Sequence, residues 1–263
     1  MENRVFVTKE AIVKGLRNLG LCRGDHVMVH CSLSALGFVC GGAQMVIEAL
    51  MEVVTPQGTI MMPTQTWKNM DPESGVHWEE PKEWWQDIRD HWPAYDKDLT
   101  PTNTMGAVAE MFRRWPGTLR SDHPVRSVAA WGHFASYFIE NHDLIDIFGE
   151  TSPIAKLYEK HGKVLLIGVD YDKNTSFHLA DARGEYPSKT TEKVHCAMTI
   201  NGERLWIGFD TLKVDGEDFI EIGRAFEVSH PVASTIIGNA TVRLMDQREA
   251  VDFATDWINA NRR

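Results

Sequence analysis

Apolar and polar positions follow two different periods in the first quarter of the chain. Residues 8–20 carry apolar side chains at helical spacing, starting with a threonine that suits an N-cap and ending with a glycine that suits a helix stop. Residues 25–32 and 58–66 are short apolar runs between turn residues, which is typical of buried strands. Residues 45–54, which lie between these runs, place their apolar side chains on one face of a helix. This strand–helix–strand order predicts parallel strands with a right-handed crossover.

The same two periods continue to the C-terminus. Residues 163–170 form an apolar run with the length and composition of a central strand. After residue 185 the apolar runs are short and strand-like, and Asn201-Gly202 between two of them predicts a hairpin. We predict an α/β fold with a central, largely parallel sheet flanked by helices and an additional β-rich C-terminal portion. The remaining predicted elements are helices at 104–115, 152–162, 217–227 and 248–263, and strands at 127–132 and within 229–246.

One segment, residues 67–103, follows neither period. It holds five of the nine tryptophans and four prolines. A loop of this length in a compact domain is usually functional or disordered, and its aromatic content argues against disorder. We expect this Trp-rich excursion to cross the surface, with some helix near 81–90, as a lid or wall of a site or as a packed cluster. The length of the chain fits a single domain formed by residues 1–263.

Composition and charge narrow the class of protein. The chain is 43% hydrophobic and 24% charged, with a formal net charge of −10 and an isoelectric point of about 5.5. Nucleic acids and anionic membrane surfaces attract basic proteins, so neither is expected as a partner. The acidic balance is compatible with a cationic small molecule, and equally with simple solubility.

The cysteines, the histidines and the N-terminus indicate the chemistry and the compartment. The four cysteines form no C-x-x-C pair, so we expect neither a disulfide framework nor a zinc knuckle. The eleven histidines include no H-E-x-x-H motif, and no metal is expected. The sequence starts without the basic and apolar regions of a signal peptide, and no apolar run approaches the ~20 residues of a membrane helix. We therefore expect a soluble cytoplasmic protein.

Two segments place polar groups next to predicted strand ends. In HCSLSALGFVCGGAQ, the hydroxyls of Ser32 and Ser34 precede a glycine-containing turn. Its backbone amides could bind an anion or form an ordinary βα turn, and neither a P-loop nor a dinucleotide fingerprint is present. In RSDHPVRSVAAWG, His123 precedes a proline and is therefore held extended, and Ser127 opens the next strand. By pattern alone this second segment is a structural turn.

A third segment, LLIGVDYDKNTSFHLADARGE, follows the strongest predicted strand. It places Asp170 and Asp172 at the sheet edge where open α/β proteins bind ligands. If SFHLADA is helical, His178 and Asp181 lie three residues apart on one helix face and can contact each other. A carboxylate that holds one imidazole nitrogen makes the other nitrogen more basic. The pattern is compatible with an active site and with a polar helix cap, whereas no G-x-S-x-G motif supports a serine hydrolase.

Taken together, five segments resemble the aminoglycoside N3-acetyltransferase family, whose members depend on coenzyme A and are distinct from the GNAT fold. The resemblance extends from about residue 8 to the last predicted helix and implies acetyl transfer from acetyl-CoA to a primary amine of a cationic acceptor. The implied acceptor amine is the 3-amino group of an aminoglycoside antibiotic, and the implied role is antibiotic resistance. A natural acceptor of another kind, or a CoA-binding protein without turnover, stays open. The segments are VMVHCSLSALGFVCGGAQMVIEAL, GTIMMPTQTW, SDHPVRSVAAWG, GETSPIAKL and LIGVDYDKNTSFHLAD.

The resemblance also implies roles for individual residues. His178 aligns with the histidine that activates the acceptor amine, and Asp181 stands where relatives often carry Glu. The acceptor-side portion of the domain is expected at about 185–245. The residues implied for acetyl-CoA are Ser32, Leu33, Ser34, Leu36 and Gly37 on one wall, and His123, Ser127, Val128 and Ala129 on the other. The candidate acceptor-binding residues are Asp170, Asp172, Asn174, Thr175, Asp218 and Glu227.

The mechanism implied by the resemblance is direct transfer in a ternary complex. Neutral His178 would take a proton from the alkylammonium while Asp181 stabilises the imidazolium, and the amine would attack the thioester carbonyl. Backbone amides or a hydroxyl near Ser32 or Ser127 would hold the oxyanion. Cys31 is expected to be a buried apolar group rather than a nucleophile. We expect a monomer or a homodimer.

Overall fold

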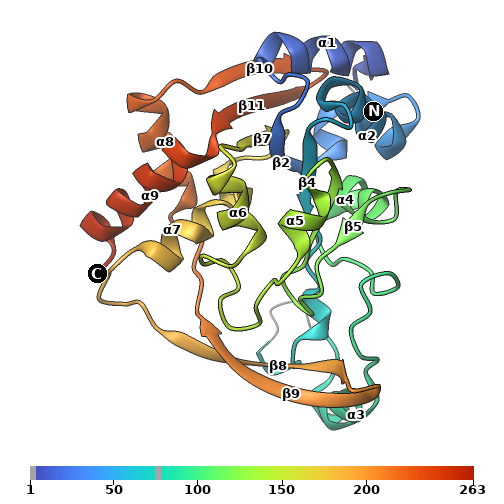
Figure 1. The fold of residues 1–263 in the computed structure, drawn as a ribbon, viewed down its shortest axis with the longest axis vertical. Coiled ribbons are helices and arrows are strands. Elements are labelled where there is room, and N and C mark those ends of the chain that lie inside the picture. Colours follow the sequence, from blue (N-terminus) through green and yellow to red (C-terminus); the bar gives the residue numbers. More distant parts are fainter. Residues whose placement is uncertain (1–3, 75–78) are drawn as a thin grey trace.

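The computed structural model describes residues 4–74 and 79–263, and a seven-stranded sheet lies at its centre (Figure 1). The strand order is β10-β11-β7-β2-β4-β6-β5. Three strands at the middle of the sheet are parallel neighbours: β7 (Lys163–Ile167), β2 (His26–Cys31) and β4 (Thr59–Pro63). The outer strands pair antiparallel: β5 (Leu119–Arg120), β6 (Val128–Gly132), β10 (Ala233–Ile237) and β11 (Ala240–Asp246). The predicted α/β class is confirmed, with the parallel strands at the centre of the sheet.

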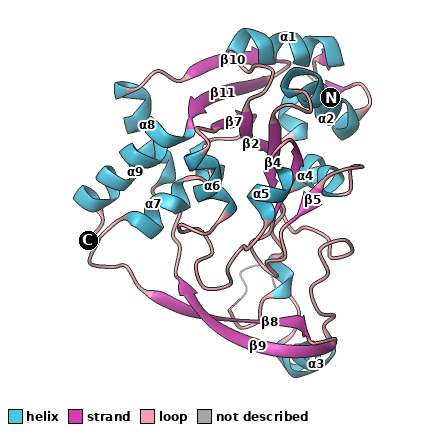
Figure 2. Cartoon of the chain, in the orientation of Figure 1, coloured by secondary structure: helices cyan, strands magenta, loops and turns pink. Residues whose placement is uncertain are grey.

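Helices cover both faces of this sheet (Figure 2). On β2, Val27 and Val29 face one helical layer and Met28 faces the other, because side chains alternate along a strand. β2 is therefore buried on both sides, as a central parallel strand should be. The first layer contains α1 (Lys9–Leu19), α2 (Gly42–Val54) and α4 (Gly106–Arg113). The second contains α5 (Ala135–Ile139), α6 (Pro153–Glu159), α7 (Phe177–Arg183), α8 (Phe219–Ser229) and α9 (Gln247–Asn261).

Two of the predicted helix ends are confirmed by their capping bonds. The Thr8 hydroxyl accepts the Ala11 N–H at 3.2 Å at the start of α1. The helix ends at Gly20, whose φ of 98° lies in the left-handed region that favours glycine. Ser152 caps α6 in the same way, by accepting the Ala155 N–H at 3.2 Å. α2 begins at Gly42, three residues before the predicted start.

Two smaller sheets complete the fold. β1 (Phe6–Val7) and β3 (Phe38–Val39) pair in parallel near the N-terminus. β8 (Thr191–Ile200) and β9 (Glu203–Leu212) form a long hairpin that extends away from the central sheet (Figure 1). Its turn residues Asn201 and Gly202 both have positive φ, 52° and 83°, as a two-residue hairpin turn requires. The predicted hairpin is confirmed.

The Trp-rich excursion packs along this hairpin rather than over the central sheet. It contains α3 (Trp85–His91) and two short 3₁₀ turns, Trp67–Asn69 and Lys82–Trp84. The Asp71 N–H donates to the His195 carbonyl at 2.8 Å, and the Tyr95 N–H donates to the Ala197 carbonyl at 3.0 Å. Hydrogen bonds to a neighbouring strand therefore order this segment. Trp78 lies outside the described residues.

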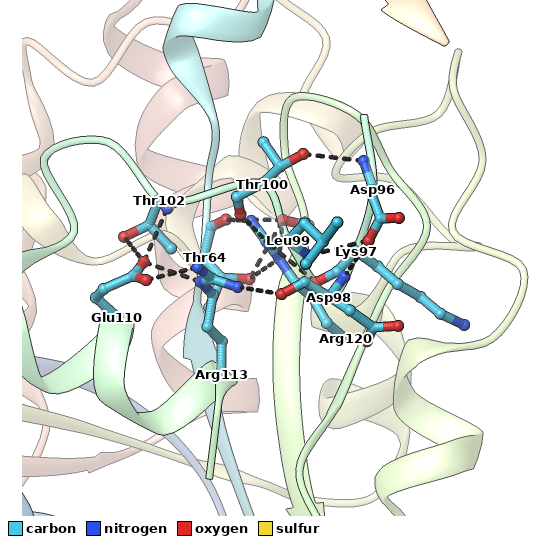
Figure 3. A network of polar contacts seen from close by, with 11 residues as sticks. Thr64, Asp96, Lys97, Asp98, Leu99, Thr100, Thr102, Glu110, Arg113 and Arg120 are labelled. Carbon is cyan, nitrogen blue, oxygen red and sulfur yellow. Dashed lines mark hydrogen bonds and ion pairs between the residues drawn. The ribbon is translucent and has the colours of Figure 1, made fainter. Parts of the chain in front are cut away.

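Two buried arginines hold the end of the excursion next to β4 and α4 (Figure 3). Arg120 donates to the Lys97, Thr100 and Thr64 carbonyls at 3.1, 2.6 and 2.7 Å. Arg113 donates to the Asp98 carbonyl at 2.9 Å and pairs with Glu110. These bonds satisfy loop carbonyls that would otherwise be buried without donors. They also fix the chain just before residues 104–106, which lie at the site described below.

No helix in residues 4–74 and 79–263 has the length and apolar character needed to cross a membrane.

Candidate active site

A cleft of about 550 Å³ opens where the parallel strands end. His30 and Ser32 line it at the end of β2, and Asn174 and His178 line it beyond the end of β7. The carboxyl ends of β7, β2 and β4 lie at one edge because these three strands are parallel. This is the edge at which open α/β sheets bind ligands, and it is where the sequence places the candidate site.

His178 and Asp181 contact each other on α7. The imidazole Nδ1 lies 2.7 Å from Asp181 Oδ2, and the predicted contact between positions three apart on a helix is confirmed. The His178 side chain is 16% exposed, whereas the Asp181 side chain is fully buried. A carboxylate accepts hydrogen bonds, so in the neutral imidazole Nδ1 carries the proton and Nε2 the lone pair.

Asp181 is supported in turn by Arg262, which follows α9. Arg262 Nη1 lies 2.5 Å from Asp181 Oδ1, and the same guanidinium pairs with Asp218 at 2.7 Å. Burial alone would lower the pKa of Arg262, but its hydrogen bonds and ion pairs with Asp218 and Asp181 outweigh burial and raise it. The buried charge of Asp181 is therefore compensated, as a buried carboxylate requires. Asp218, a predicted acceptor-binding residue, contacts Arg262 and is absent from the described lining of the cleft.

Two phenylalanines fix the plane of the His178 ring. Phe148 stacks on it with centroids 4.6 Å apart and an interplanar angle of 17°. Phe219, from the start of α8, lies 4.8 Å away at 55° and also lines the cleft. No described residue hydrogen-bonds to Nε2 of His178, so this nitrogen is available to a ligand in the cleft. The ring is held in one orientation before any ligand binds.

Only part of the predicted loop at 32–37 reaches the cleft. Ser32 lines it, and the Ser32 and Ser34 hydroxyl oxygens are 3.3 Å apart. Leu36 is buried in the core beneath the loop. Gly37 lies against the backbone of Val5, at a φ of 105° that favours glycine. Leu33, Ser34, Leu36 and Gly37 are absent from the cleft lining among the described residues.

The segment at 123–129 lies outside the lining of this cleft among the described residues. His123 is fully buried, and its Nδ1 accepts the N–H groups of Val125 and Arg126 at 3.1 and 2.9 Å, so the ring organises a turn. Ser127 is also buried; its hydroxyl donates to the Thr64 carbonyl at 2.7 Å. The contact of this segment with the cofactor therefore finds no support in the cleft lining and stays a prediction. Val128 and Ala129 are buried sheet residues as well.

Instead, the second wall comes from the segment after β4 and from the start of α4. Gln65, Trp67 and Thr104 line the cleft there. The Arg126 guanidinium stacks 3.8 Å from the centroid of the Trp67 ring and also lies near Phe148, the ring that stacks on His178. One buried cation therefore contacts both this wall and the support of the His178 ring. Sequence analysis did not assign these residues to the site, although Gln65 and Trp67 lie in the GTIMMPTQTW segment and their place after a parallel strand was a usable signal.

The other five predicted acceptor-binding residues divide into two groups. Asp172, Asn174 and Thr175 line the cleft. Asp170 and Glu227 do not; both are neutralised by Arg224, at 2.6 and 3.3 Å. Arg243 also contacts both carboxylates, and Glu227 further accepts the Tyr171 hydroxyl. These two side chains organise the turn after β7 rather than offering free carboxylates to a ligand.

Two further residues at the end of β2 have chemistry that burial controls. Burial raises the pKa of the Cys31 thiol to about 12, so the thiol stays protonated and is a poor nucleophile. Burial, with a smaller effect from His178, lowers the pKa of His30 to about 3, so this imidazole is neutral. Sequence analysis did not single out His30, although it is the second-last residue of β2, a central strand of the sheet. Among the described residues, no group of three potential metal ligands is present.

Comparisons with known proteins agree with this arrangement. The family model described as aminoglycoside 3-N-acetyltransferase matches residues 28–259. An SPbeta prophage-derived aminoglycoside N(3′)-acetyltransferase-like protein of Bacillus subtilis is 42% identical over 97% of this chain and 93% of its own length. Aminoglycoside N(3)-acetyltransferase IX of Micromonospora chalcea is 34% identical over 97% of this chain and 94% of its own.

Solved structures show the same relationship in three dimensions. The crystal structure of the Bacillus subtilis YokD protein superposes with a TM-score of 0.94 at 41% identity, covering 98% of this chain and 95% of that one. AAC-VIa bound to sisomicin has a TM-score of 0.89 at 30% identity, with 98% and 99% covered. AAC-IIIb in a binary complex with CoASH has a TM-score of 0.87 at 29% identity, with 97% of each chain covered.

Proposed function

Because the chain belongs to the aminoglycoside 3-N-acetyltransferase family, we propose that it transfers an acetyl group from acetyl-CoA to an amine of an aminoglycoside. The acceptor amine expected from the family name is the one at position 3, and the expected consequence is antibiotic resistance. Relatives of this chain that bind sisomicin and CoASH support both substrates. The four cysteines are free thiols, which fits the reducing cytoplasm, where we expect the enzyme to work.

The observation that carries the proposal is the free Nε2 of His178 in the cleft. An alkylammonium cannot attack a carbonyl until it loses a proton, and a neutral imidazole is a suitable acceptor near neutral pH. Asp181 orients the ring at 2.7 Å and stabilises the imidazolium that forms. General-base catalysis of this kind contributes about 10²–10⁴-fold to the rate.

For the donor, we propose that acetyl-CoA enters past Ser32 with its thioester end toward His178. Both residues line the same cleft, so the thioester carbonyl and the imidazole can meet there. The loop residues Leu33, Ser34, Leu36 and Gly37 lie next to Ser32 and remain candidates for contact with the rest of the cofactor outside the cleft. Transfer is direct, because the protonated Cys31 does not provide a covalent intermediate.

For the acceptor, we propose Asp172, Asn174 and Thr175 as the contacts after β7. Asp172 is the one carboxylate among the described lining residues, and it is paired with Lys173 at 2.8 Å. Lys173 also lines the cleft, so a cationic acceptor would meet one carboxylate paired with a lysine and several neutral donors and acceptors rather than a strongly acidic wall.

A thiol-release assay with acetyl-CoA and a panel of amines tests the proposal. We expect CoA release that requires an aminoglycoside, with the acetylated product identified by mass spectrometry. Release without any acceptor, together with labelling by a serine-reactive phosphonate, would indicate a hydrolase. CoA binding without release for any amine would indicate a binding protein. CoA release only with unrelated amines would support acetyl-CoA as the donor but contradict an aminoglycoside as the acceptor.

A further inference from the structure

Two buried polar side chains in the cleft wall lack hydrogen-bond partners. His30 is 6% exposed, Asn174 is fully buried, and both line the cleft together with His178. Nε2 of His30 and Nδ2 of Asn174 are buried, and neither bonds to any described residue. A buried polar group without a partner costs about 1–3 kcal/mol, so such groups are uncommon unless a ligand or water satisfies them. Two of them in one cleft indicate a polar ligand group.

The amide orientation of Asn174 is fixed by its neighbour. Its Oδ1 accepts the N–H of Ser176 at 3.2 Å, just before α7 begins. A backbone N–H can only donate, so the atom facing it must be the amide oxygen. Nδ2 is then a pure donor, and its missing partner must be an acceptor such as a carbonyl oxygen.

His30 is a neutral donor on the same side of the sheet as His178. Side-chain alternation along β2 places His30 with Met28, and Met28 packs in the cluster that contains Leu179 and Ala180 of α7. Burial lowers the pKa of His30 to about 3, so at neutral pH it carries one ring proton. It does not compete with His178 as a base, but its N–H can donate to an oxygen, as neutral imidazoles do in other enzymes.

We infer that His30 and Asn174 bind the carbonyl oxygen of the acetyl thioester and stabilise the oxyanion that forms on it. The inference rests on the proposed function. The amine nitrogen bonds to the carbonyl carbon, and the π pair moves to the oxygen. When the C=O bond reforms, the C–S bond breaks and the thiolate leaves with the electron pair. The ammonium proton passes to Nε2 of His178 before the attack and then to the thiolate sulfur, and the second proton, which the nitrogen of the adduct loses, passes to solvent. Two donors already in place lower the energy of the oxyanion without reorganisation.

The hydroxyl expected in this role from the sequence is not available. Ser127 donates to the Thr64 carbonyl and accepts the Arg120 Nε at 3.0 Å. It is buried outside the cleft lining, so a thioester oxygen has no access to it. Among residues 4–74 and 79–263, His30 and Asn174 are buried cleft residues that each keep one nitrogen without a hydrogen-bond partner.

The experiment compares His30→Leu with wild type in two measurements. Turnover with saturating acetyl-CoA and acceptor should fall about 10²-fold, the usual cost of losing one oxyanion donor. Calorimetry should show a CoA affinity within about twofold of wild type. The wild type should bind acetyl-CoA about threefold to tenfold more tightly than CoA, because only acetyl-CoA has the carbonyl, and the variant should lose this preference. His30→Gln, which restores an N–H, should recover part of the turnover. Asn174→Asp keeps the acceptor for Ser176 and removes the donor, so its loss should be at least as large.

His26→Leu is the matched control. His26 lies on the same strand and face, also has a buried unpaired nitrogen, and packs against Phe134 and Phe138 instead of the cleft. Its turnover should stay within about twofold of wild type. The inference is overturned if His30→Leu retains turnover within about threefold, or if CoA affinity and turnover fall together. If wild type accepts no amine, the proposed function fails, yet the acetyl-CoA preference and its loss in His30→Leu still decide the inference.

Discussion

Asp181 Oδ2 lies 2.7 Å from Nδ1 of His178, while Oδ1 of the same carboxylate lies 2.5 Å from Arg262. One fully buried carboxylate thus links the imidazole in the cleft to the end of the last helix. The contact fixes the tautomer of His178 and leaves Nε2 as the basic nitrogen. Arg262, which supports this carboxylate, lies 81 positions away from Asp181 in the sequence.

Asp181→Asn tests the link between the carboxylate and the imidazole. The amide keeps the shape but loses the charge that stabilises the imidazolium, and it can present its NH₂ to Nδ1, which favours the wrong tautomer. We expect kcat to fall by at least about 10²-fold with little change in CoA affinity. Asp181→Glu should lose less, because it keeps the charge. Equal activity of Asp181→Asn and wild type in the thiol-release assay would show that this contact does not serve catalysis.

Arg262→Met tests the second link of the chain. Without the guanidinium, Asp218 loses its ion pair with Arg262 and Asp181 keeps only its contact with His178. We therefore expect a lower melting temperature and a loss in kcat of about tenfold, because Asp181 is less well fixed. Arg263→Met is the matched control, since Arg263 is the exposed next residue. Thermal unfolding and initial rates measure both effects. If the two variants behave alike, Arg262 does not position Asp181 for catalysis.

Asp172→Asn tests the acceptor side of the cleft. Asp172 is partly exposed and already paired with Lys173, so its attraction for a cation is that of a surface ion pair, about 1 kcal/mol or less. We expect the KM for a cationic acceptor to rise about threefold to fivefold, with kcat and the KM for acetyl-CoA unchanged. Asp256→Asn, on the exposed face of α9, should leave all three constants unchanged. An unchanged acceptor KM in Asp172→Asn would remove this carboxylate from the acceptor site.

Stability should fall as the pH is lowered from 7 to 5. Burial lowers the pKa of His30 to about 3 and holds the pKa of His123 well below its usual value. The unfolded chain, with ordinary histidines near pH 6.5, therefore binds protons that the folded chain does not. This contribution to the free energy of unfolding is complete above pH 6.5 and is lost as the pH falls toward the folded pKa. For His30 the loss is about 2 kcal/mol between pH 7 and 5.

Urea unfolding followed by circular dichroism measures this pH dependence. The His30→Leu variant should lose less stability than wild type between pH 7 and 5, whereas His91→Gln, at the exposed end of α3, should follow wild type. An unchanged wild-type free energy of unfolding over this interval would contradict the lowered pKa values of His30 and His123 in the folded chain.

Local patterns predicted most of the fold and the centre of the site. The Thr8 cap, the Asn201-Gly202 turn and the His178–Asp181 contact all depend on residues within a few positions of each other, so the sequence shows them directly. The parallel strands were predictable for the same reason, because apolar runs and crossover helices alternate along the chain.

Contacts between distant segments could not be predicted in this way. Asp170 and Glu227 resemble free carboxylates until Arg224 and Arg243 are placed beside them. The position of His123 differs in kind: the local pattern predicted a structural turn, and its ring accepts the N–H groups of Val125 and Arg126 within that turn, whereas its cofactor role came from the resemblance. Nothing in the local sequence marks the contacts of Asp170 with Arg224 and Arg243, because they depend on how separate elements pack.

The central claim is that Nε2 of His178 removes the proton that prevents the acceptor amine from attacking acetyl-CoA. Thiol release by His178→Ala, measured at saturating acetyl-CoA and acceptor, tests it most directly. Calorimetric titration with CoA confirms that the variant still binds the cofactor. The account predicts turnover at least about 10²-fold below wild type with CoA affinity retained. Turnover within about threefold of wild type would contradict it.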